Sequence, residues 1–261
     1  MHILQKPVSA LLFDMDNTLF DLVGAQISSC HKVAEYLGQD DGDELFSYFL
    51  KPVHGFESHE NIRQYMQERD IPVDGNFAVA CSIYEDQKLA HITPYSGVIK
   101  TLQILRERDY PMCIVTDAHS RDASLRMERS GLLPFFCCMV SWDMAGAKKP
   151  SPEPFLTALE MMQAGPDGAL FIGDSPRRDI QPCTELGIRT VYARYGDRFS
   201  PTRDFRDADF IIDTMKNFLQ SFPHSEGLCI YNCMRCFSGA ITDFSGKTCD
   251  SGKFSLVLTE T

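Results

Sequence analysis

The sequence has few basic residues for its number of acidic ones. It carries 25 Lys and Arg against 36 Asp and Glu, a formal net charge of -11 at pH 7. Proteins that hold nucleic acid without sequence preference neutralise its phosphates with Lys and Arg, so nucleic acid is not expected as a partner. The sequence also lacks an apolar run long enough to span a bilayer, and its opening lacks the pattern of a signal peptide. We therefore expect a cytoplasmic protein with no membrane partner.

The ten cysteines do not predict a disulfide scaffold, because a chain of 261 residues is not short and carries no secretion signal. Six of them lie within predicted helices and strands and are interpreted as small, reduced core residues: Cys30, Cys81, Cys113, Cys137, Cys138 and Cys183. The other four form a C-x3-C-x2-C-x12-C series: Cys229, Cys233, Cys236 and Cys249. Four thiolates at such spacing suit a structural zinc, but a standard ribbon has two CxxC pairs and this series has one. A zinc site and a tail of unpaired, reduced cysteines both stay open.

Short apolar runs separated by helical patterns indicate the fold class. The runs predict buried strands at residues 8–13, 111–115, 137–141, 169–173, 188–192 and 210–212. Apolar residues with helical spacing lie between them, and this alternation predicts an α/β protein with a doubly wound parallel sheet.

Two regions depart from the alternation. Residues 21–93 contain helical stretches and no convincing strand, so they are interpreted as an α-helical cap inserted into a core of residues 1–20 and 94–222. Beyond this core, residues 223–261 are rich in Ser, Gly, Thr and Cys and form a Cys-containing C-terminal extension of unknown role.

Polar residues follow directly on the predicted strands. In a doubly wound sheet, ligands bind beyond the carboxyl ends of the strands, so these residues are the candidates for a functional site. They are Asp14 and Asp16 after the first run, Thr116 and Asp117 after the second, Lys149 before Pro150 after the third, and Asp174 and Asp179 after the fourth.

These four motifs, in this order and strand context, resemble those of the haloacid dehalogenase superfamily, in its phosphatase-like subfamily with a helical cap between the first two motifs. The resemblance covers about residues 8–222 and implies a Rossmann-like core. It implies that Asp14 is the nucleophile and Asp16 the general acid and base. Substrate-binding residues would be Thr116, Asp117 and Lys149, although Asp117 also suits the N-terminal cap of the next helix. Metal ligands would be Asp14, Asp174 and the backbone carbonyl of Asp16, with Asp179 supporting the metal shell.

The chemistry of a phosphate ester explains why such residues are needed. The ester repels nucleophiles by its own charge, so a site must neutralise that charge and align an oxygen in line with the leaving group. A carboxylate can accept the phosphoryl group covalently, and a second carboxylic acid can protonate the leaving oxygen. Carboxylates crowded around a phosphate need a cation, and Mg²⁺ suits hard oxygen ligands.

The resemblance also bears on which reaction is expected. Dehalogenases of this superfamily usually lack a carboxylate at the position of Asp16, so its presence favours phosphoryl transfer. Asn17 stands where many members have Gly. We expect a magnesium-dependent phosphatase acting on a small phosphorylated metabolite such as phosphoglycolate, a triose or sugar phosphate, or a nucleoside monophosphate. The alternatives are a sugar phosphomutase of the same superfamily and a non-catalytic binding protein on the same scaffold. The sequence does not predict the oligomeric state.

Overall fold

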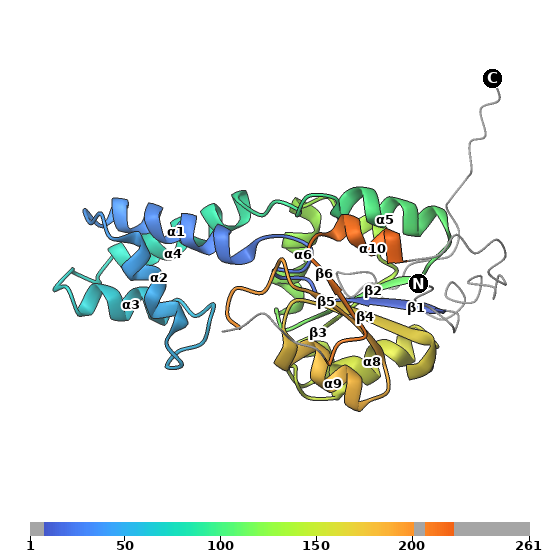
Figure 1. Ribbon diagram of the computed structural model, residues 1–261. Coiled ribbons are helices and arrows are strands. Elements are labelled where there is room, and N and C mark those ends of the chain that lie inside the picture. The colour runs from blue at the N-terminus through green and yellow to red at the C-terminus, as the bar shows by residue number, and fades with distance from the viewer. Residues whose placement is uncertain (1–7, 201–206, 222–261) are drawn as a thin grey trace, which may run out of the picture. The chain divides into compact units, whose positions relative to one another are not determined.

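The computed structural model describes residues 8–200 and 207–221, and helices separate the first five of its six strands along the chain (Figure 1). The strands are β1 (Ala10–Phe13), β2 (Met112–Thr116), β3 (Cys138–Ser141), β4 (Ala169–Gly173), β5 (Arg189–Ala193) and β6 (Phe210–Ile212). Each begins and ends within two residues of a predicted run. Strands buried on both faces need continuous apolar residues, which is why their positions can be read from the sequence. The prediction of burial is wrong for β6, which lies at the edge of the sheet and leaves Ile211 37% exposed.

All neighbouring strands are parallel, in the order β3-β2-β1-β4-β5-β6. This is the order of a doubly wound sheet, so the predicted fold class is confirmed. In register, Phe13 lies beside Ile114 of β2 and Ile172 of β4. The residues that follow Phe13 therefore emerge between the carboxyl ends of two neighbouring strands.

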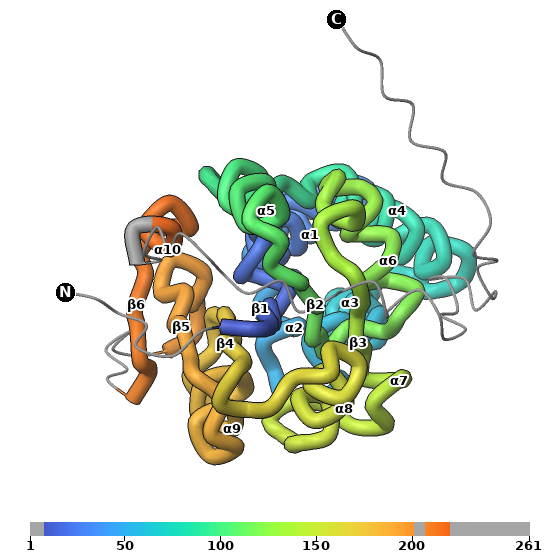
Figure 2. Tube along the Cα trace, turned by 90° about the vertical axis from the view of Figure 1, so that its right-hand side faces the viewer, coloured from blue at the N-terminus to red at the C-terminus, as the bar shows by residue number. Residues whose placement is uncertain are grey.

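Helices cover both faces of the sheet (Figure 2). One face carries α5 (Val98–Glu107), α6 (Ser120–Arg129) and α10 (Met215–Ser221), and the other carries α8 (Glu153–Met161) and α9 (Gln181–Glu185). Leu11 and Phe13 pack into the first layer and Leu12 into the second, as the two-residue repeat of a strand requires. Short helical turns complete this part of the chain: Leu133–Phe135, α7 (Trp142–Ala145), Pro166–Gly168 and the π-helical turn Pro176–Ile180.

Four helices occupy the stretch between β1 and α5: α1 (Leu22–Tyr36), α2 (Gly42–Leu50), α3 (Glu60–Gln67) and α4 (Asn76–Ala90). Residues 21–93 contain no strand. The four helices share an apolar core of their own, in which the rings of Phe49 and Tyr84 stack with centroids 4.9 Å apart. Asp21 caps the first of them by accepting a hydrogen bond from the backbone N–H of Gly24 at 2.9 Å.

The described cysteines are free thiols, and three of them, Cys30, Cys113 and Cys183, are buried as expected. The interpretation as a core residue is wrong for Cys137, which is exposed just before the edge strand β3 begins. The four cysteines of the predicted extension lie outside the described residues. None of the described helices is long and apolar enough to cross a bilayer.

Candidate active site

Asp14 is the first residue beyond β1, and its carboxylate is held on both sides. Its backbone N–H donates to the carbonyl of Ile172 at 2.8 Å, which continues the sheet pairing one residue past the strand. The Thr18 hydroxyl donates to Oδ2 at 2.8 Å, and Lys149 Nζ lies 2.5 Å from Oδ1. Asp14 is buried, so these contacts fix the orientation of a carboxylate that has little access to water.

The chain turns sharply after Asp14. Asn17 adopts the backbone conformation that the turn requires, and Gly196, from the loop after β5, leaves room for the turn. Asn17 has φ of +63°, a left-handed conformation that Gly and Asn adopt most readily. Its side-chain oxygen accepts from the N–H of Val23 at 3.1 Å. Gly196 lies so close that a Cβ there would be 1.7 Å from the carbonyl oxygen of Asn17. Asn therefore replaces Gly in this motif without loss of the turn.

Lys149 supplies a buried cation between two carboxylates. Its Nζ lies 2.5 Å from Asp14 Oδ1 and 2.7 Å from Asp179 Oδ1. Burial disfavours the charged ammonium, but Asp14 and Asp179 outweigh it and raise the pKa of Lys149 above its usual value. The neighbouring Lys148 is exposed, with its ammonium 5.3 Å from the centre of the Trp142 ring.

Asp117 and Thr116 lie at the end of β2, and their side chains have different surroundings. The Asp117 carboxylate accepts a hydrogen bond from the backbone N–H of Lys149 at 2.8 Å and lies 3.4 Å from Arg178 Nη1. Asp117 therefore supports the loop that presents Lys149. Thr116 is buried, and its hydroxyl accepts from the N–H of Ala118 at 3.1 Å. A hydroxyl that accepts one bond can still donate its hydrogen to a phosphate oxygen.

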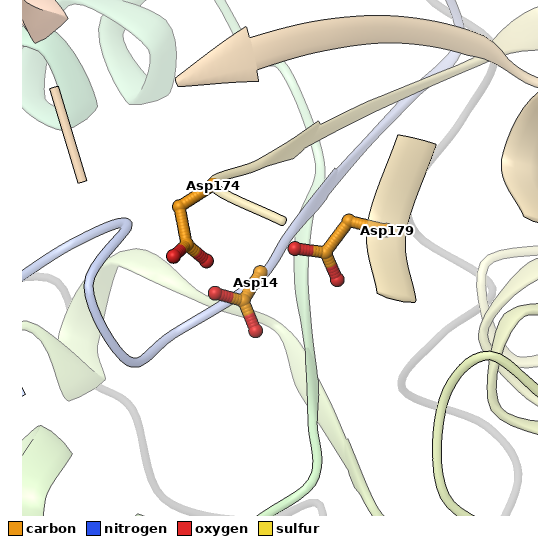
Figure 3. A group of neighbouring side chains, drawn as sticks. All are labelled: Asp14, Asp174 and Asp179. Atoms are coloured by element: carbon orange, nitrogen blue, oxygen red, sulfur yellow. The ribbon is translucent and has the colours of Figure 1, made fainter. Parts of the chain in front are cut away.

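Asp14, Asp174 and Asp179 form a buried acidic cluster beyond β1 and β4 (Figure 3), in which one carboxylate oxygen from each lies within 4.8 Å of the others. Burial, Asp14 and Asp179 raise the pKa of Asp174 well above its usual value. Burial and Asp14 raise the pKa of Asp179 to about 6, although Lys149 opposes the shift. Gly173 permits this crowding, because a Cβ there would lie 2.5 Å from Asp179 Oδ2.

One oxygen of the cluster provides a test of whether a metal fits. Asp174 Oδ1 is buried and has no hydrogen-bond partner in the described part of the chain. A buried carboxylate oxygen without a partner is costly unless a cation compensates for it. Hard carboxylate oxygens are the donors that Mg²⁺ prefers, so the residues present fit a divalent cation.

Asp16 lies apart from this cluster and faces Arg126. Both of its carboxylate oxygens are close to Arg126 Nη1, at 3.0 and 2.9 Å. Burial raises the pKa of Asp16 to about 6, with Glu57 and Asp14 adding to the shift and Arg126 opposing it. Arg126 Nη2 also donates to Glu57 Oε1, from the segment between α2 and α3.

Sequence reasoning missed Arg126 and Glu57. The spacing of Arg126 along α6 could have revealed it, because Arg126 shares the buried face of that helix with Ala123 and Met127. A cavity of about 470 Å³ lies beside it, lined by residues of α4, α6 and the segment that precedes α3, among them Glu57 and Arg126.

Comparison with known proteins identifies the family. The model of the haloacid dehalogenase-like hydrolases matches residues 11–193, more than half of the chain. The glyceraldehyde 3-phosphate phosphatase of Methanopyrus kandleri is 28% identical over 223 residues, which cover 81% of this chain and 96% of that protein. The phosphoglycolate phosphatase of Chromobacterium violaceum is 25% identical over 194 residues, 73% of this chain and 87% of that protein.

A solved structure agrees on the fold. A haloacid dehalogenase-type hydrolase of Bacillus subtilis, described as bound to magnesium, superposes with a TM-score of 0.66 at 20% identity, covering 82% of this chain and 98% of that one. The predicted resemblance is thus confirmed, and the chain belongs to the haloacid dehalogenase-like hydrolase family.

Proposed function

We propose that this protein is a magnesium-dependent phosphatase that hydrolyses a small phosphorylated metabolite through a phosphoryl group carried on Asp14. The observation that carries the proposal is the placement of Asp14: a buried carboxylate at the end of β1, held by Lys149 and Thr18 and next to an acidic cluster with an unpartnered oxygen. The relatives named above as phosphatases of glyceraldehyde 3-phosphate and phosphoglycolate support a small phosphate ester as substrate.

The reaction would proceed in two halves. In the first, an oxygen of Asp14 attacks phosphorus, the ester P–O bond breaks, and Asp16 gives its proton to the leaving oxygen. In the second, water attacks the phosphoryl group on Asp14 and Asp16 takes a proton from that water. Inorganic phosphate leaves, and both carboxyl groups return to their starting state.

Magnesium would be held by the carboxylates of Asp14 and Asp174 and the backbone carbonyl of Asp16, with Asp179 supporting the shell. When bound, it would offset the negative charge of the phosphate and of the carboxylates around it. The partnerless Asp174 Oδ1 supports this assignment, and so does the description of the B. subtilis structure.

The other predicted residues have distinct parts. Lys149 and Thr116 would bind phosphate oxygens, whereas Asp117 acts through Lys149 by accepting its backbone N–H. In the absence of substrate, Lys149 is neutralised by Asp14 and Asp179, so phosphate would replace part of that pairing.

We also propose the division of the chain into a core of residues 1–20 and 94–222 and a cap of residues 21–93, which the separate apolar core of α1–α4 supports. The cavity between α4 and α6 would receive the leaving group, so substrate choice would depend on residues of both cap and core. The free thiols of the described chain are compatible with a reducing, cytoplasmic location.

The test is release of inorganic phosphate by the purified full-length protein from a panel of esters: phosphoglycolate, triose and sugar phosphates, nucleoside monophosphates and p-nitrophenyl phosphate. We expect hydrolysis with Mg²⁺ and none with a chelator. Asp14→Asn is expected to keep its fold by circular dichroism and lose turnover, because an amide is a poor nucleophile. Full activity of Asp14→Asn would refute the covalent route. Isomerised sugar phosphate without phosphate release would indicate a phosphomutase instead.

A further inference from the structure

Arg126 connects the proposed acid and base to the helical region between β1 and α5. It lies on α6, its side chain is 4% exposed, and its Nη1 contacts both carboxylate oxygens of Asp16. The other terminal nitrogen, Nη2, donates to Glu57 Oε1. The three residues lie far apart in the sequence: Asp16 and Arg126 are separated by 110 positions, and Glu57 and Arg126 by 69.

Glu57 lies between two buried cations. Its Oε1 accepts from Arg126 of α6 and also lies 3.3 Å from the ammonium of Lys88, on α4. Lys88 is 6% exposed and is held in turn by Glu85, one helical turn earlier, at 2.9 Å. The carboxylate of Glu57 therefore links Arg126, on α6 of the proposed core, to Lys88, on α4 of the proposed cap.

The identity of residue 126 matters for this arrangement. A buried ion pair is a weak source of stability, because desolvation of the charges offsets their attraction. The face of α6 that carries Arg126 is otherwise apolar, with Ala123 and Met127, so a hydrophobic residue would serve packing as well. A guanidinium has donors in one plane that can hold two carboxylates at once, which an ammonium on a flexible stem does less precisely.

We propose that Arg126 is a positioning residue for leaving-group protonation: it fixes the carboxylate of Asp16, and Glu57 in turn fixes Arg126. The proposal rests on the phosphatase function given above. It makes the placement of Asp16 dependent on contact between the Glu57 segment and α6. Specificity then follows, because a leaving group that disturbs the Glu57 contact also displaces the residue that protonates it.

If Arg126 acts through Asp16, its loss has a kinetic effect that depends on the leaving group, which a purely structural role would not produce. An alkoxide leaving group needs a proton, whereas p-nitrophenolate departs without one. Loss of Arg126 is therefore expected to slow phosphoryl transfer to Asp14 from an alkyl phosphate far more than from p-nitrophenyl phosphate. The comparison is made in kcat/KM, which reports the first half of the reaction, because Asp16 also takes a proton from water in the second half and that half is the same for both esters. Arg126 is bound to Asp16 and Glu57 and is not assigned to the phosphate, so binding of the ester is expected to change little.

The experiment compares Arg126→Lys, Asp16→Asn and the double variant on both kinds of ester. For the alkyl ester we expect Arg126→Lys to lower kcat/KM by about 10²-fold, the lower end of what acid–base catalysis contributes, and by less than about threefold for the aryl ester. In the Asp16→Asn background, Arg126→Lys is expected to cost nothing further. Arg69→Lys is the matched control, since Arg69 binds Asp41 and Glu44 within the cap helices and contacts no proposed site residue.

Equal losses of kcat/KM on both esters, or an undiminished loss in the Asp16→Asn background, would overturn the positioning role while leaving the phosphatase function intact. A wild-type protein that releases phosphate from no ester would overturn the function itself, and the positioning role with it. Glu57→Gln provides a second route if Arg126→Lys does not fold. It retains Arg126 but replaces the carboxylate that fixes it by a neutral amide, so a smaller loss of about tenfold in kcat/KM, confined to alkyl esters, is expected. A Glu57→Gln enzyme with wild-type kcat/KM on alkyl esters would contradict the link to the cap.

Discussion

Asp174→Asn is expected to make the metal-free protein more stable and the enzyme inactive. Asp174 is 3% exposed, and its carboxylate lies within 4.8 Å of those of Asp14 and Asp179. Two unit charges at that separation repel by about 3.5 kcal/mol at an effective dielectric constant of about 20. Lys149 and protonation of Asp174 relieve part of this repulsion, which leaves a net gain of about 2 kcal/mol for the amide. For a protein of this size, that gain corresponds to a rise in Tm of about 4–8 °C.

The assay is thermal unfolding with a chelator and then with Mg²⁺. Wild type is expected to gain stability from Mg²⁺, by about 2.7 kcal/mol when the free ion is at 100 times its Kd. Asp174→Asn is expected to gain much less, because it lacks the carboxylate that would bind the ion. Asp174→Asn is therefore expected to have the higher Tm of the two proteins with chelator. With Mg²⁺ the Tm of wild type is expected to rise until this difference disappears.

Asp197→Asn is the matched control, because Asp197 is equally buried but fully partnered. It accepts from the Tyr192 hydroxyl at 2.5 Å and from the N–H groups of Phe199 and Ser200 at 3.0 and 2.9 Å. Asp197→Asn is expected to lower the free energy of unfolding by about 1–3 kcal/mol, with or without Mg²⁺. An Asp174→Asn protein that is less stable than wild type in chelator, or a wild type indifferent to Mg²⁺, would refute the reasoning.

Three further changes test other parts of the structure. Lys149→Met is expected to abolish turnover and lower the free energy of unfolding by about 3–5 kcal/mol, measured by denaturant titration without metal, because Asp14 loses a buried counter-charge. Gly196→Ala is expected to cost about 1–3 kcal/mol and reduce kcat, since its Cβ would collide with the carbonyl of Asn17; wild-type values in both assays would show that this loop can move aside. A chain that ends at Phe222 is expected to fold and hydrolyse esters like the full-length protein, and insolubility or inactivity would place the domain boundary elsewhere.

The strands were predictable because burial on both faces demands apolar runs, and the residues following them were predictable because parallel strands end at one edge. The structure brings together Asp14, Lys149, Asp174 and Asp179 there. Contacts that depend on distant pairing were not predictable. Nothing in the sequence near Asp117 shows that its carboxylate is bound to a backbone N–H 32 residues away.

Arg126 is a second residue whose contacts could not be predicted from the sequence. An Arg on an apolar helix face usually extends its charge to water along its aliphatic stem, so its type alone does not indicate burial. Its two partners come from the β1 loop and from an irregular segment before α3, and no local pattern relates them. Cys137 was misjudged for a related reason, because an apolar run does not show that its first residue lies outside an edge strand.

The order of the strands explains why the candidate site residues lie together at the carboxyl end of β1. From β1 the chain winds outward to β2 and β3, then returns to the other side of β1 for β4, β5 and β6, so β1 lies at the point where the winding reverses. In open α/β sheets the ligand site lies at such a point, beyond the carboxyl ends of the strands. Asp14 receives Lys149 from the connection after β3 and the acidic pair Asp174 and Asp179 from the connection after β4. Asp16, two residues on, faces Arg126 of α6, the helix that follows β2, so the proposed phosphate binding and proton transfer would be supported by different parts of the sheet. If these roles hold, substitutions around Arg126 are expected to alter the choice of leaving group while the proposed phosphate site stays unchanged.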